Sequence, residues 1–302
     1  MIAGIYLFIP GKIQISRTVM IPVTPPAAFR VLSEKNNWKK WWPDESYERD
    51  STNKNNTFFY NGYSYQLSQK FFNTVGVIIK NKHDAKIISS INILSMHRDS
   101  VALEWQTETV LSKNPLKRIQ DSREAREIEN DIGVILSHIQ SFLAEKENVY
   151  GMKIQKTIVK DTLMISTKFF SRKYPTTAEI YSSIKKLREY ISKKGVSETN
   201  YPMLNISMTD SNNFQTMVAI PINELLKDNS NISLKRMVRG NILEAEVKGG
   251  EFTAREALTQ LDNYVKDYNM DSPAIPFELL ITDRSKELDT TKWITKLYYP
   301  IF

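Results

Sequence analysis

Cysteine is absent from this chain of 302 residues. Without thiols the protein can form no disulfide and no thiolate metal site, and it has no cysteine nucleophile. Histidine is scarce as well: His83, His97 and His138 have no histidine or carboxylate at the spacing of metal ligands. We therefore expect neither a metal nor a cofactor.

Long apolar runs are also missing. Residues 1–11 form an apolar stub, in which the run from Ile2 to Ile9 has eight residues, whereas a membrane-spanning helix takes about twenty. No basic segment precedes the run, so it is not a complete signal peptide. It fits a first strand or a mobile tail, and it also fits the end of a membrane tether through a segment upstream of Lys12. Without such a tether we expect a cytoplasmic protein.

Charge is not concentrated in any block of five or six like residues, although 41 lysines and arginines outnumber 34 acids and the net charge is +7. So diffuse an excess gives little support to nucleic-acid binding, and no segment has a helix-turn-helix pattern. We expect no nucleic-acid partner. The chain is about twice the usual domain length, and 41% of its residues are hydrophobic, so two globular domains are expected.

The first predicted domain, residues 12–148, begins with a strand from Lys12 to Pro22 and a short helix after Thr24. Strand-like runs separated by turn residues follow between Thr57 and Val110, which is typical of an antiparallel meander. From Pro115 to about Lys146 the apolar period becomes helical. The stripe of this helix consists of Ile128, Ile132, Ile135, Ile139 and Phe142.

Three tryptophans stand close together in Asn37-Trp-Lys-Lys-Trp-Trp-Pro43. Trp38, Trp41 and Trp42 could border a cavity or fill the core, and we favour packing because buried indoles are common core anchors. With Ser16-Arg-Thr-Val and the order of elements, this motif makes residues 12–148 resemble the START-like polyketide cyclase and lipid-transport superfamily. The resemblance implies a curved sheet that grips the long helix over a cavity, and a lipid or polyketide ligand.

Residues 152–302, the second predicted domain, contain an internal repeat. An offset of 74 residues lays the apolar stripe of a helix predicted from Thr177 to Lys193 on that of a helix predicted from Thr253 to Asp267. Pro202 then falls on Pro276. Each half has the order strand, helix, strand, strand, so we expect duplicated βαββ units and an α+β fold class for the whole chain.

A predicted strand near the C-terminus carries a single carboxylate, Glu278. Because side chains alternate along a strand, Glu278 shares a face with Leu280 and points away from Phe277 and Leu279. One interpretation is a solvent-facing acid with Lys296 of the next strand as its cross-strand partner. The other is a pocket lined by aromatic side chains with one acid, which suits a flat organic cation.

The second domain resembles the GyrI-like small-molecule-binding domains, which are effector-binding domains in BmrR-type regulators. The resemblance is carried by Val247-Lys-Gly-Gly-Glu-Phe-Thr-Ala254, by Pro276-Phe-Glu278, and by Trp293-Ile-Thr295 with Leu297-Tyr-Tyr-Pro-Ile301. It implies that Glu278 is the buried acid that meets cationic effectors and that Tyr298 is the family's aromatic residue before the terminal proline. The chain departs from the family at Leu280, where an aromatic is usual, and at Ser285, where a proline is usual.

The ligand-binding residues that we expect are Glu278, Leu280, Tyr298, Trp293 and Phe252. An unpaired Glu278 in an apolar pocket would cost several kcal/mol unless a cation offset it, so Glu278→Gln should melt no lower than the wild type. Three functions remain open: binding of a hydrophobic, cationic small molecule for sensing or sequestration, hydrolysis of reactive electrophiles with Glu278 activating water, and lipid or polyketide binding by the first domain.

Overall fold

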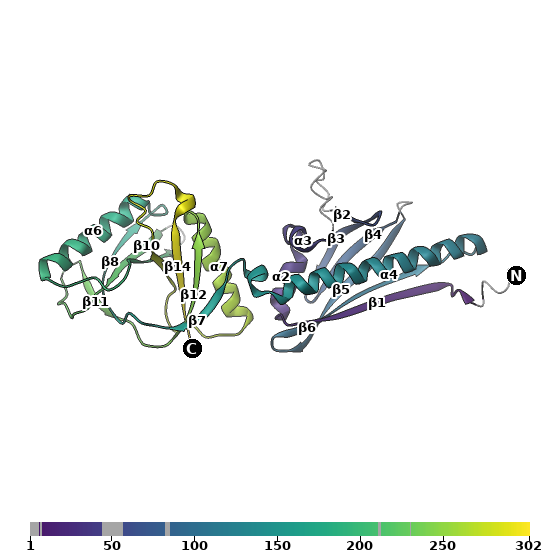
Figure 1. The fold of residues 1–302 in the computed structure, drawn as a ribbon, viewed down its shortest axis with the longest axis horizontal. Coiled ribbons are helices and arrows are strands. Elements are labelled where there is room, and N and C mark those ends of the chain that lie inside the picture. Colours follow the sequence, from purple (N-terminus) through teal and green to yellow (C-terminus); the bar gives the residue numbers. More distant parts are fainter. Residues whose placement is uncertain (1–5, 7, 44–56, 82–84, 211–212, 230) are drawn as a thin grey trace. The chain divides into compact units, whose positions relative to one another are not determined.

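The computed structural model of the chain describes residues 6, 8–43, 57–81, 85–210, 213–229 and 231–302. The chain divides into two compact units, Met1–Val149 and Tyr150–Phe302. Each unit combines an antiparallel sheet with helices, so the predicted α+β class is confirmed (Figure 1). Among the described residues, no helix is both long and apolar enough to span a membrane. Most of the apolar run from Ile2 to Ile9 lies outside the described residues.

The first unit contains a six-stranded sheet with the order β1-β6-β5-β4-β3-β2. The strands are β1 (Lys12–Ile21), β2 (Thr57–Tyr60), β3 (Tyr63–Phe71), β4 (Thr74–Lys80), β5 (Lys86–His97) and β6 (Ser100–Val110). The helices are α2 (Pro25–Ser33), α3 (Lys35–Trp41) and α4 (Pro115–Ala144), with the short α5 (Lys146–Tyr150) at the junction. All neighbouring strands pair antiparallel, as the predicted meander requires.

α4 packs on the sheet because it carries one continuous apolar stripe. The helix begins at a capped end, where the Asn114 side chain accepts hydrogen bonds from the N–H groups of Leu116 and Lys117. The buried stripe, which packs mainly along β1, includes Ile128, Ile132, Ile135, Ile139 and Leu143. Leu143 takes the last position predicted for Phe142, which is half-buried. A long helix on a sheet is what the START-like resemblance implies, while the family itself stays a prediction.

The three clustered tryptophans are packed into the first unit. Trp38, Trp41 and Trp42 are all buried. Trp38 Nε1 donates to the Leu32 carbonyl at 2.7 Å, and Trp42 Nε1 donates to the Phe59 carbonyl at 2.9 Å. The Trp38 and Trp42 rings stack with their centroids 5.6 Å apart. These contacts support the interpretation that the cluster fills the core.

The second unit contains an eight-stranded sheet with the order β11-β8-β10-β9-β13-β14-β12-β7. The strands are β7 (Ile154–Ile158), β8 (Leu163–Ser171), β9 (Met203–Asp210), β10 (Asn213–Pro221), β11 (Ser233–Arg236), β12 (Asn241–Lys248), β13 (Phe277–Leu280) and β14 (Ile294–Ile301). The helices are α6 (Thr177–Lys194) and α7 (Glu251–Asp267). The order β8-β10-β9 in one half corresponds to β12-β14-β13 in the other, so the two βαββ units meet at the β9–β13 pair.

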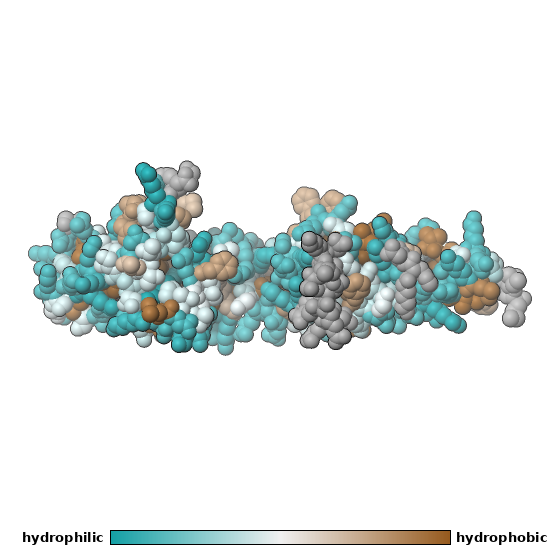
Figure 2. All heavy atoms as spheres, turned by 90° about the horizontal axis from the view of Figure 1, so that it is seen from above, coloured by the Kyte–Doolittle hydropathy of each residue, from teal (hydrophilic) through white to brown (hydrophobic). Residues whose placement is uncertain are grey.

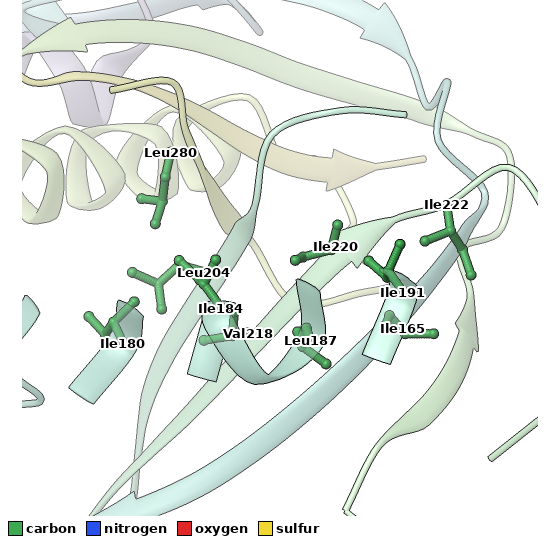
Figure 3. Close-up of a cluster of buried hydrophobic side chains, with 10 residues drawn as sticks. All are labelled: Ile165, Ile180, Ile184, Leu187, Ile191, Leu204, Val218, Ile220, Ile222 and Leu280. Carbon is green, nitrogen blue, oxygen red and sulfur yellow. The ribbon is translucent and has the colours of Figure 1, made fainter. Parts of the chain in front are cut away.

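α6 closes one core of the second unit. It begins with a capping box, in which Thr176 Oγ1 accepts from the Glu179 N–H and the Glu179 carboxylate accepts from the Thr176 N–H. It ends at Gly195, whose φ of 69° favours glycine. The buried side chains between α6 and the sheet, drawn in Figure 3, are Ile165, Ile180, Ile184, Leu187, Ile191, Leu204, Val218, Ile220, Ile222 and Leu280. The face of the molecule seen in Figure 2 is mostly hydrophilic, with small and scattered hydrophobic patches.

Tyr150 is the first residue of the second unit, and its side chain is held against α7. Its hydroxyl donates to Asp267 Oδ2 at 2.9 Å, and its ring meets Tyr264 edge-on at 5.0 Å. The fragment 150–302 should unfold cooperatively, because it has its own sheet and cores. Within that fragment Tyr150→Phe should lower the free energy of unfolding by about 1–2 kcal/mol, since the buried Asp267 loses a donor.

Urea denaturation followed by circular dichroism measures both effects. Tyr201→Phe is the matched control, because the Tyr201 side chain is exposed, and its effect should be close to zero. A fragment that unfolds without cooperativity, or equal effects of the two substitutions, contradicts this prediction.

Candidate ligand-binding site

β13 places the candidate site at the centre of the eight-stranded sheet. Its pairing sets Glu278 between Leu204 of β9 and Leu297 of β14. Leu204 is also the residue that the 74-residue offset assigns to Glu278. The carboxylate therefore lies where the two repeats meet, and elements of both repeats surround it.

A buried ion pair joins Glu278 to Arg284. Arg284 Nη2 donates to Glu278 Oε2 at 3.2 Å, and the two residues are 6% and 7% exposed. The same Nη2 donates to Thr295 Oγ1 at 2.7 Å, and the guanidinium carbon lies 4.9 Å from the centroid of the Trp293 ring. Buried Arg284 Nε has no acceptor among the described residues. The guanidinium thus contacts an acid and an indole, as an organic cation would.

A turn after β13 brings Arg284 back toward that strand. Asp283 Oδ1 accepts from the Ser285 N–H at 3.1 Å, an arrangement typical of aspartate at turns. The Arg284 N–H donates to the Tyr181 hydroxyl at 2.6 Å, and that hydroxyl donates to the Thr282 carbonyl at 3.2 Å. Because Tyr181 belongs to α6, the first repeat holds the turn that positions the guanidinium in the second.

Burial and pairing act on Glu278 in opposite directions. Burial raises the pKa of Glu278 above its ordinary value, while the charge and hydrogen bond of Arg284 oppose that rise. Burial also raises the pKa of Tyr174, and the negative charge of Glu278 adds to this effect. Tyr174 therefore stays a neutral phenol that can donate or accept a hydrogen bond near the carboxylate.

A cavity of about 720 Å³ borders Glu278, within the range of roughly 300–1,000 Å³ that small-molecule sites occupy. The aromatic side chains that line it on the face of Glu278 are Tyr174, Phe214, Phe252 and Tyr299. Tyr174 meets Phe214 edge-on at 5.5 Å, and the guanidinium carbon of Arg255 lies 4.8 Å from the Tyr174 centroid. Its charged lining residues are Arg255, Glu256, Asp262 and Glu278. Carboxylates thus outnumber cations on the cavity wall.

Glu278 and Phe252 are the predicted ligand-binding residues that line this cavity. Phe252, in the first turn of α7, is 76% exposed, so its ring is free to cover a ligand. Trp293 takes part differently, because its buried ring packs on the guanidinium of Arg284. In the part of the chain that the structure describes, no group of three or more histidine and acidic side chains is placed to hold a metal ion.

Leu280 and Tyr298 are not brought to the cavity. Leu280 shares the face of Glu278, as predicted, but it belongs to the hydrophobic core under α6. Tyr298 pairs with Phe277 and stacks on it at 5.2 Å, so it lies on the opposite face of the sheet. The proposed cross-strand partner of the acid, Lys296, also lies on that opposite face and binds Glu244 at 2.8 Å.

The sequence did not predict that Arg284 is the partner of Glu278. The pocket interpretation has an unpaired carboxylate at Glu278 and the other interpretation pairs it with Lys296, whereas the structure supplies a guanidinium from a loop six residues further along the chain. One physical argument indicates that Glu278 needs a partner: a carboxylate between apolar neighbours requires a cation or hydrogen-bond donors if it is buried. The sequence contains many lysines and arginines, and only the turn geometry selects Arg284.

Comparisons with known proteins show limited similarity. The chain matches no model of a known protein family and no curated protein. Among solved structures it is similar to EcmrR in a complex with DNA, with a TM-score of 0.45 and 17% identity over 61% of this chain and 69% of that chain. It is also similar to the EcmrR C-terminal domain (TM-score 0.41, 18% identity, 50% and 98% covered) and to SAV2435 bound to tetraphenylphosphonium (0.34, 12%, 50% and 94%). These TM-scores mark a partial likeness, so the function is argued from the site itself.

The second prediction is that Glu278 and Arg284 are energetically coupled. Arg284→Met leaves a buried carboxylate without its cation, and Glu278→Gln leaves a buried guanidinium without its anion. Each change should lower the free energy of unfolding by about 3–5 kcal/mol. The double variant should lose about 1–3 kcal/mol less than the sum, because it buries no unpaired charge.

Urea denaturation of the wild type, the two single variants and the double variant measures this coupling. The exposed pair Arg188 and Glu198, 3.0 Å apart, is the matched control, and breaking it should change stability by less than about 1 kcal/mol. Strictly additive effects at Glu278 and Arg284 would contradict the buried pair. The pairing also replaces the expectation that Glu278→Gln melts no lower than the wild type.

Proposed function

We propose that the second unit binds a flat, hydrophobic small molecule with a positive charge in the cavity beside Glu278. The observation that carries this proposal is the buried carboxylate in an aromatic-lined cavity, with one oxygen already on a guanidinium. Oε2 accepts from Arg284, and no described group donates to Oε1. That second oxygen is available for an N–H donor or a cationic centre of a ligand.

Arg284 supports the proposal because its guanidinium already makes the contacts with Trp293 and Glu278 that we expect of a ligand's cationic group. Its guanidinium lies against the Trp293 ring and on the Glu278 carboxylate. A ligand cation can bind beside Arg284 at Oε1, or it can displace the guanidinium from Glu278. In either arrangement the ligand cation forms a charge-assisted contact with the Glu278 carboxylate.

Hydrolysis of a reactive electrophile would use the same carboxylate as a general base. Burial favours this role by raising the pKa of Glu278, whereas the contact with Arg284 makes the carboxylate less basic. Binding is therefore the function that the geometry supports better. The first unit has a cavity of about 860 Å³ between α4 and the strands β5 and β6. Its lining includes the charged side chains of Lys86, Glu108, Lys117, Asp121 and Glu124, which do not favour an apolar lipid chain there.

The third prediction distinguishes the contribution of the ligand's charge to binding from that of its shape. N-methylacridinium is a flat cation, and acridine at about pH 8 is its neutral counterpart. Glu278→Gln should weaken binding of N-methylacridinium to the full chain by roughly ten to a hundredfold, because a charge-assisted contact in a dry site is lost. Acridine should bind the two proteins with similar affinity. Isothermal titration calorimetry measures both.

Glu189→Gln, an exposed acid on α6, is the control and should leave both affinities unchanged. Equal affinity of the wild type and Glu278→Gln for the cation ends the case for this site. Chemical conversion of a bound electrophile by the wild type but not by Glu278→Gln would favour the hydrolase instead.

The fourth prediction concerns the pH dependence of ligand affinity. Because the pKa of Glu278 is raised above its ordinary 4.5, acidification protonates this carboxyl earlier than an exposed glutamate. The affinity of wild type for N-methylacridinium should therefore fall as pH drops through that raised pKa, while Glu278→Gln should show a flat profile over the same range. Fluorescence titration of the dye between about pH 4 and 8 measures this difference, and parallel profiles would contradict it.

A further inference from the structure

The sheet of the second unit has a second cavity, of about 350 Å³, on the face opposite Glu278. Because side chains alternate along β13, Glu278 and Leu280 lie on the helix-covered face, and Phe277 and Leu279 lie on the other. Phe277 lines this second cavity from that face. The segments around Arg239 and Ala274 complete its wall.

The wall of this cavity is apolar and adaptable. Four methionines line it: Met164, Met203, Met217 and Met237. Ala219, Phe277 and Ile275 add further apolar surface. Methionine is unbranched and polarisable, so a wall of this kind can fit flexible hydrocarbon or irregular rings. Its composition favours an apolar body of the ligand over a rigid polar one.

The charged residues of the cavity are all positive. Lys235, Arg236 and Arg239 line it, all three are exposed, and no aspartate or glutamate belongs to the lining. None of the three forms an ion pair with another residue that the structure describes. Three unneutralised cations beside a methionine-lined cavity give a positive potential at its edge, where an anionic group would be attracted.

We propose that this cavity binds an amphipathic anion, a single carboxylate on an apolar chain or ring system, of which a medium-chain fatty acid is the simplest example. The carboxylate lies among Lys235, Arg236 and Arg239 at the edge of β11. The apolar part lies over the methionines. The two cavities thus differ: the cavity of Glu278 offers a buried carboxylate, and this one offers exposed cations.

Isothermal titration calorimetry of the full chain with dodecanoate, dodecanol and dodecylammonium, each below its aggregation concentration, tests the proposal. Dodecanoate should bind at least tenfold more tightly than dodecanol. Dodecylammonium should not displace bound dodecanoate, because any binding of this cation would be beside Glu278 on the other face of the sheet. The variant Arg236→Gln/Arg239→Gln should weaken dodecanoate about tenfold and leave dodecanol unchanged, since two exposed charges contribute roughly that much. Ala274→Trp, at an exposed position on the wall, should weaken binding of both dodecanoate and dodecanol by filling the cavity.

The matched control is Lys185→Gln/Lys186→Gln, which removes two exposed charges on α6 and should change nothing. Equal binding of dodecanoate and dodecanol, or equal effects of the two double variants, overturns the proposal. Binding to phosphatidylglycerol vesicles without binding to monomeric dodecanoate overturns it too, because a membrane surface would then be the source of the anion. Arg236→Gln/Arg239→Gln should leave N-methylacridinium binding unchanged, so failure here and failure at the Glu278 cavity remain distinguishable.

Discussion

The contact between Glu278 and Arg284 is the interaction on which the second unit depends. Removing a carboxylate and a guanidinium from water costs several kcal/mol per ion, and their mutual attraction compensates only when the geometry is good and further donors and acceptors are satisfied. Thr295 accepts a second hydrogen bond from the guanidinium, and the ring of Trp293 covers it. Tyr181 fixes the backbone of Arg284. These contacts hold the Glu278 carboxyl group and its cationic partner together in an apolar interior.

The repeat explains why the carboxylate stands where it does. Two βαββ units that pair through β9 and β13 bring equivalent positions of their strands face to face, so Glu278 is opposite Leu204, its own counterpart. One repeat places a leucine at this position and the other an acid. This single difference puts a polar side chain at a position that is apolar in the other repeat. The loop with Arg284 belongs to the same repeat as the acid. The function that we propose thus depends on a departure from the internal symmetry.

Periodicity predicted most of the fold. The helical stripes of α4, α6 and α7 and the strand alternation follow directly from burial of one face, and the 74-residue offset predicted the two βαββ units. The site was predicted less well. Glu278 stands out because an acid between apolar residues is unusual, but its partner is selected by a turn, Asp283 to Ser285, whose course no periodicity encodes. Tyr298 was assigned to the ligand although strand alternation and the pairing with Phe277 place it on the other face.

The ionisation of Glu278 is the most direct test of its buried pair with Arg284. Side-chain carboxyl ¹³C resonances of glutamate, followed by NMR through a pH titration of the full chain, give the pKa of Glu278 in the wild type and in Arg284→Met. We expect a pKa of Glu278 above the ordinary 4.5 in the wild type, because the group is buried, and a further rise in Arg284→Met, because the opposing charge is gone. An ordinary pKa that does not change on removal of Arg284 would show a solvated, unpaired carboxylate and would contradict both the buried pair and the site built on it.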